Sequence, residues 1–121
     1  MALSMDSQSV LNDSVLERIR KAGGDALLDK LVDCFFTYAP ERFEKLTVAI
    51  QGRDWSGVEY LAHSLKSSAG NVGARGLFAL LNEVEVAAAQ GKTAEIVSAL
   101  DALQDRYAEF LAALSRIRPN A

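Results

Sequence analysis

The chain has a single cysteine, a single histidine and only two prolines among its 121 residues. One cysteine excludes an internal disulfide and leaves no second thiol at the spacing of a zinc site. We expect this residue, Cys34, to be an inert core thiol, because it lies in an apolar run of helical period. No convergent set of histidine, cysteine and carboxylate residues indicates a metal or haem site, so we expect neither metal nor cofactor.

The sequence also lacks the patterns of membrane, secreted and nucleotide-binding proteins. No apolar run reaches the roughly 18 residues of a membrane-spanning helix, and the N-terminus has no basic and then apolar signal segment. No glycine-rich phosphate loop is present, so ATP binding and kinase activity are not indicated. The net charge of −3 argues against general nucleic-acid binding. We expect a cytoplasmic, monomeric protein that binds neither nucleic acid nor membrane.

The composition suits one folded domain. Hydrophobic residues make up 50% of the chain, which is enough for a core, and charged residues make up an ordinary 24%. Residues 1–11 are small and polar with no strong period, and we expect them to be a flexible tail. The domain itself is expected to span residues 12–118.

Apolar residues recur with helical period through most of this domain. A capping box of Ser14 and Glu17 predicts a short helix that ends at Gly23 and Gly24. A long apolar stripe follows to Gly52, and Pro40 within it predicts a kink or short break around residues 38–40. Three more helices are expected, over residues 54–70, 75–91 and 93–117.

No segment has the period of a strand, and the connections between the expected helices are short. Short connections place consecutive helices antiparallel to each other. The predicted fold is therefore an all-α antiparallel four-helix bundle with one or two short additional helices.

The only histidine lies in the third of these helices. Lys66 follows His63 by one turn, and Ser67 and Gly70 lie on the same face. The opposite face is apolar and consists of Leu61, Ala62, Leu65 and Ala69. We therefore expect His63 on the solvent side of its helix, beside a cation and among side chains too small to cover it.

The surroundings of this histidine contain no acidic residue. From residue 60 to residue 82 there is no Asp or Glu, although Lys66 and Arg75 are present and the whole chain is acidic. Such a region suits a group that carries or approaches an anion. Two basic residues in a stretch of this length are equally compatible with ordinary surface charge.

The spacing His63, Lys66, Ser67, Gly70 and Gly73 resembles the signature of histidine-containing phosphotransfer domains. The turn 52–55 before it and the helical stretch 77–91 after it, with Glu85, also resemble that family, and the likeness covers about residues 14–117. Ser67 stands where the family usually has Gly, which implies slightly less clearance.

This resemblance implies a function and a set of site residues. His63 would accept a phosphoryl group on Nε2, Lys66 would neutralise phosphoryl oxygens, and Glu85 would hydrogen-bond Nδ1 of the histidine. The small residues Ser67 and Gly70 would let a partner approach. The chain would then be a phosphorelay intermediate that takes the group from a receiver aspartyl phosphate and passes it to another receiver aspartate.

The partners implied are response-regulator receiver domains and a hybrid sensor histidine kinase, and any Mg²⁺ would belong to the receiver. Exposed parts of residues 15–36, such as Ile19, and the turn after the histidine helix, with Arg75, are further candidate contacts. The initial methionine and polar tail favour a free-standing chain over a segment of a larger kinase.

The residues also bear on two other functions. Ser64 and Ser68 invite comparison with a hydrolase, but one histidine without a nucleophile elbow provides no catalytic triad. A helical adaptor that binds a signalling partner without chemistry remains the alternative. Substitution of His63 by Gln separates the two, because it abolishes phosphoryl transfer and leaves adaptor binding intact.

Overall fold

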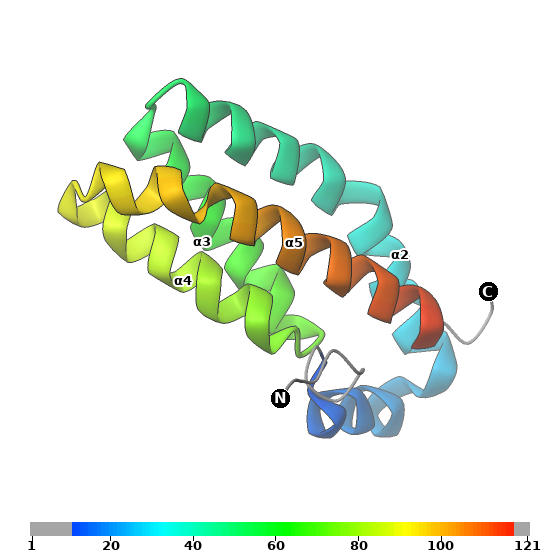
Figure 1. Cartoon of the computed structure of the whole chain (residues 1–121). Helices are drawn as coiled ribbons and strands as arrows, with labels where there is room; N and C mark the ends of the chain where they lie inside the picture. The colour runs from blue at the N-terminus through cyan, green and yellow to red at the C-terminus, as the bar shows by residue number, and fades with distance from the viewer. Residues whose placement is uncertain (1–10, 118–121) are drawn as a thin grey trace.

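The computed structural model describes residues 11–117, and helices joined by short turns account for nearly all of them. The helices are α2 (Asp13–Gln51), α3 (Trp55–Asn71), α4 (Arg75–Gln90) and α5 (Thr93–Ile117) (Figure 1). Within the described range there is no strand, and the one bridge pairs Leu11 with Ala74. No helix of residues 11–117 is long and apolar enough to cross a membrane.

The helices form an antiparallel bundle, as predicted. Helix α3 packs between α2 and α4, and α5 packs against α4 and α2, so the four helices enclose one core. Figure 1 shows the long part of α2 running beside α5, whereas its blue N-terminal part lies at an angle to the bundle axis, at one end of the bundle. The change of direction occurs at Gly24, whose φ of 69° and ψ of −165° are not helical. Residues 13–23 are thus the short additional helix expected before Gly24.

The prediction around residues 38–40 was a kink or a short break, and the break is wrong because the helix is continuous there, whereas the kink stays a prediction. Helix α2 continues through Pro40, and the departure from helical backbone angles reported inside it is at Gly24. Proline removes one intrahelical hydrogen bond. The buried side chains of Phe35, Ala39 and Phe43 lie on both sides of that position and anchor the helix to the core. Their burial offsets the missing bond.

The core is a continuous apolar stripe that α2 shares with the other three helices. Aromatic contacts fix α2 to α5: Phe35 meets Phe110 edge to face at 4.7 Å, and Phe43 stacks on Tyr107 at 4.1 Å between ring centroids. The buried residues of α2 after Gly24 recur every three or four positions up to Ala49, which Ile50 follows directly, and are Leu28, Val32, Phe35, Ala39, Phe43, Leu46, Ala49 and Ile50.

Two predicted environments in α2 are wrong. Ile19, expected at the surface, is only 9% exposed and belongs to the core cluster, because the segment before Gly24 packs its own apolar face inward. Cys34, expected in the core, is exposed. It lies between the buried positions Val32 and Phe35, about 100° around the helix from Phe35, and therefore faces the side of the stripe.

The predicted tail, residues 1–11, lies outside the described residues except for Leu11, which is fully buried. The Asn12 amide donates to the Gly73 carbonyl at 2.6 Å, so the residue that precedes α2 is attached to the turn between α3 and α4. Gly73 has φ 75°, and a Cβ there would lie 2.9 Å from Cβ of Asn12. Glycine is required at this turn for both reasons.

Candidate functional site

The site lies on the facing sides of α3 and α4, which are antiparallel and in a regular register. His63 on α3 pairs with Glu85 on α4. One turn after His63, Lys66 pairs with Asn82, which lies one turn before Glu85. The next turn of each helix brings Gly70 opposite Phe78. The main chain at the start of α3 is held by Asp54, which accepts a hydrogen bond from the Gly57 amide at 3.1 Å. The α3–α4 hairpin thus lines up the candidate site side chains in successive turns.

The imidazole of His63 is held at one nitrogen and open at the other. Nδ1 lies 2.9 Å from Oε2 of Glu85, and the side chain is 62% exposed. Among residues 11–117, no group hydrogen-bonds Nε2. The ring therefore has a fixed orientation and presents Nε2 to solvent, which agrees with the role that the family resemblance implies for Glu85.

Lys66 is more enclosed than the sequence suggested. Its side chain is only 19% exposed, with Nζ 2.8 Å from Oε1 of Glu85 and 3.1 Å from Oδ1 of Asn82. The ammonium also lies 5.9 Å from the centre of the Phe78 ring. Lys66 is thus fixed against α4 by an ion pair, a hydrogen bond and a ring contact, and Asn82 and Phe78 are two residues of this site that sequence reasoning missed.

The carboxylate of Glu85 joins the histidine to the lysine. Oε1 is buried, and its contact with the ammonium is an ion pair and not a well-directed hydrogen bond. The nearby Lys66 ammonium holds the pKa of Glu85 below its ordinary 4.5, burial opposes this shift, and His63 adds a smaller lowering. Glu85 is therefore ionised at neutral pH and acts as the acceptor of the Nδ1–H of His63, and in the neutral ring this tautomer has its lone pair on Nε2.

The candidate partner contacts Ser67, Gly70 and Arg75 lie at the surface as predicted. Ile19, the fourth candidate, does not. Gly70 has a second role, because a Cβ there would lie 3.3 Å from two carbons of the Phe78 ring. The glycine therefore accommodates Phe78 on the partner helix as well as leaving the face open.

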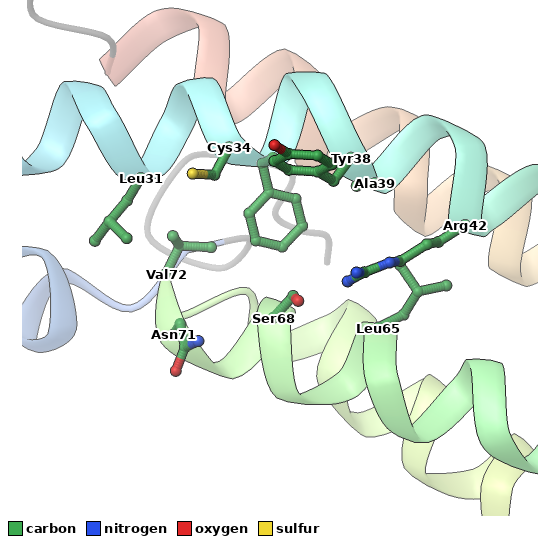
Figure 2. Close-up of a pocket in the computed structure, with 10 residues that line it drawn as sticks. Leu31, Cys34, Tyr38, Ala39, Arg42, Leu65, Ser68, Asn71 and Val72 are labelled. Atoms are coloured by element: carbon green, nitrogen blue, oxygen red, sulfur yellow. The ribbon is translucent and has the colours of Figure 1, made fainter.

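A groove lies between α2 and the histidine helix, α3, and it was not predicted from the sequence. Its volume is about 220 Å³, and Figure 2 shows the Arg42 guanidinium directed into the space between the two helices. The exposed Cys34 lies on its α2 side. The groove is lined by Leu31, Cys34, Phe35, Tyr38, Ala39, Arg42, Leu65, Ser68, Asn71 and Val72.

Acidic, cysteine and histidine side chains do not gather into a metal site in the part of the chain that the structure describes. No group of three or more of them is close enough there to hold an ion. The carboxylate beside His63 is already engaged by Nδ1 and by the lysine.

Comparison with known proteins places this geometry in a family. The Hpt domain model matches residues 30–116. The structure is similar to the crystal structure of histidine-containing phosphotransfer protein B (HptB) from Pseudomonas aeruginosa PAO1, with a TM-score of 0.85 and 25% sequence identity over 93% of this chain and 96% of that one. No curated protein sequence matches the chain. Proteins of the Hpt family generally carry phosphoryl groups and interact with receiver domains and kinases of two-component systems. The chain belongs to the Hpt domain family and has a histidine phosphotransfer role in phosphorelay signalling.

Proposed function

We propose that His63 is the residue that carries the phosphoryl group, on Nε2. The observation that supports this is the 2.9 Å contact of Nδ1 with Glu85, in a side chain that is 62% exposed. His63 is also the only histidine of the chain, and transfer in this family takes place on histidine. The nucleophile is therefore a fixed imidazole with one ring nitrogen available.

The transfer requires no proton movement at the attacking atom. The Nε2 lone pair attacks the phosphorus of a receiver aspartyl phosphate, an N–P bond forms, and the P–O bond to the aspartate breaks to release its carboxylate. Nδ1 keeps its proton, so the phosphorylated ring carries positive charge. The ionised Glu85 stabilises that charge through the Nδ1–H hydrogen bond. The reverse sequence returns the phosphoryl group to another aspartate.

Lys66 stabilises the phosphoryl oxygens. The group brings roughly two negative charges near neutral pH. One cation at ~4 Å in an effective dielectric of about 20 contributes about 4 kcal/mol per unit charge, which solvent and salt reduce. This attraction retains the group on His63 and still permits its release, as a carrier requires.

The partner that we propose is a receiver domain, with a hybrid sensor histidine kinase upstream. Ser67, Gly70 and Arg75 are exposed on or next to the histidine helix and would contact it. The adjoining groove offers an apolar floor and one cation, Arg42. The receiver would supply the aspartate and its Mg²⁺, and the chain would carry out no ATP-dependent step. A monomeric, cytoplasmic carrier is part of this proposal.

Intact-mass analysis tests the proposal. The protein is mixed with receiver domains that carry an aspartyl phosphate, next to a His63→Gln variant. We expect one acid-labile phosphoryl group on the wild type and none on the variant. Binding of the receiver without any gain of mass would support the helical adaptor instead, whereas a gain on the variant would move the acceptor to another residue.

A further inference from the structure

We propose that Asn82 is a positioning residue that sets the direction of the Lys66 ammonium toward the phosphoryl group. The inference rests on the proposed function and extends it to a residue that the signature does not contain. Asn82 Oδ1 accepts a hydrogen bond from Nζ of Lys66 at 3.1 Å, from the next helix and 16 residues along the chain.

The donors of the ammonium determine what Asn82 does. A lysine ammonium has three N–H groups. One donates to Asn82, and the Glu85 carboxylate lies 2.8 Å from the same nitrogen. The hydrogen bond to Asn82 then sets the directions of the remaining N–H groups, which are the donors left for a phosphoryl oxygen. Without Asn82 the ammonium could rotate about Glu85 alone.

The chemistry of the amide also suits this position. Asn82 supplies an acceptor without charge, so it orients the lysine and adds no repulsion toward an incoming dianion. A carboxylate at the same place would hold the lysine equally well and would oppose the phosphoryl group. Asn82 lies within the α3–α4 register as the residue opposite Lys66, one turn from Glu85, so the helices bring it to the lysine without any loop.

The burial of Lys66 indicates that its orientation is maintained in solution. An exposed lysine would sample many rotamers, whereas this one is 19% exposed with its ammonium between Asn82, Glu85 and the Phe78 ring. Asn82 itself is exposed, so its substitution does not disturb the core. The site therefore allows the orienting contact to be removed separately from the fold.

The experiment measures the rate of His63 phosphorylation by phosphoramidate, a small donor that needs no docking, for four proteins in two backgrounds. Wild type, Asn82→Leu, Asn82→Asp and Gln90→Leu are each prepared with Lys66 intact and with Lys66→Met. Gln90→Leu removes an exposed amide from the end of the same helix and serves as the matched control. Thermal unfolding of every variant confirms that the bundle is retained.

We expect Asn82→Leu to slow phosphorylation about fivefold, the equivalent of one lost hydrogen bond. In the Lys66→Met background the same substitution should change nothing, because Asn82 acts through the lysine. Asn82→Asp should also be slow, and added salt should restore part of its rate but not that of Asn82→Leu. Gln90→Leu should match wild type.

Equal losses for Asn82→Leu in both backgrounds, or a wild-type rate for it with Lys66 intact, would overturn the role of Asn82. Failure of the proposed function would give a different result. The wild-type chain would then take no phosphoryl group on His63 from phosphoramidate or from a receiver, and both proposals would fall together.

Discussion

Glu85 on α4 holds Nδ1 of His63 on α3 at 2.9 Å, across 22 residues of sequence. This contact assigns different tasks to the two ring nitrogens, since Nδ1 is bound and Nε2 is open. The second oxygen of the same carboxylate lies 2.8 Å from the Lys66 ammonium, so one side chain orients both the proposed nucleophile and the cation. The geometry of the proposed phosphotransfer site therefore depends on the pairing of α3 with α4.

Removal of the Glu85 charge should weaken the fold in a pH-dependent way. Because the folded-state pKa is below 4.5, the ionised form stabilises the native state above that pH, and the contribution is lost as pH falls through the folded pKa. Glu85→Gln should thus lower the free energy of unfolding by about 1 kcal/mol at neutral pH. Urea unfolding at a series of pH values should show the difference shrinking in acid. A difference that is constant with pH would contradict the lowered pKa.

The turn after the histidine helix should not tolerate a side chain at Gly73. Alanine there must adopt a positive φ and also collide with Asn12, whereas alanine at Gly91, with φ 73° and open space around it, meets only the first problem. Gly91→Ala should cost about 1 kcal/mol of unfolding free energy. Gly73→Ala should cost at least twice as much, measured by urea unfolding. Equal losses would show that the attachment of Asn12 to this turn contributes nothing.

Tyr107 should be replaceable by phenylalanine with a gain in stability. Its hydroxyl is buried without a hydrogen-bond partner among residues 11–117, and burial raises its pKa to about 12. Tyr107→Phe should retain the stack on Phe43 and raise the free energy of unfolding by about 1 kcal/mol. Because the unfolded tyrosine ionises near 10.0, the wild type should lose further stability relative to the variant from there toward pH 12.

The exposed Tyr60 provides the control for this substitution. Its side chain is largely in solvent, so Tyr60→Phe should leave the unfolding free energy unchanged. A loss of stability in Tyr107→Phe would mean that the buried hydroxyl has a partner.

The single cysteine allows the groove between α2 and α3 to be blocked selectively. Cys34 is exposed and lines the groove, so a bulky maleimide attached there should hinder a receiver that covers this side of α3. We expect transfer from a phosphorylated receiver to fall at least about tenfold, while phosphorylation by phosphoramidate continues at the unlabelled rate, because only the receiver must dock.

A label on the opposite side of the bundle is the matched control. Val97 is exposed on α5, which packs against α2 and α4, and Val97→Cys with Cys34→Ser places the same maleimide there. This protein should accept phosphoryl groups from both donors at normal rates. Normal receiver transfer by the Cys34-labelled chain would show that docking does not use the groove.

The predictable parts of the site are those governed by helical spacing and by the family signature. His63, Lys66, Ser67 and Gly70 share a face because they recur at three or four residues, and the surface positions of three of them were confirmed. Lys66 also lies on the predicted face, but the low exposure of its side chain was not predicted. The structure also joins Glu85 to His63, a contact that only the family resemblance of the stretch 77–91 implied.

The remaining features depend on tertiary contacts that a single helical pattern does not contain. Pro40 is tolerated because of residues packed on either side, Ile19 is buried by a segment whose direction is set at Gly24, and the groove arises from the spacing of two helices. Asn82 could have been found from the hairpin register, because the residue three before Glu85 must face the residue three after His63.

Nitrogen-15 NMR of the phosphorylated protein, with labelled histidine, tests the central claim most directly. One imidazole is present, so each ring nitrogen gives one signal. If Glu85 occupies Nδ1, phosphorus coupling appears on Nε2 and the Nδ1 signal stays that of a protonated, hydrogen-bonded nitrogen. Coupling to Nδ1 would contradict the account, because it requires the Glu85 contact to break before the phosphoryl group can bind.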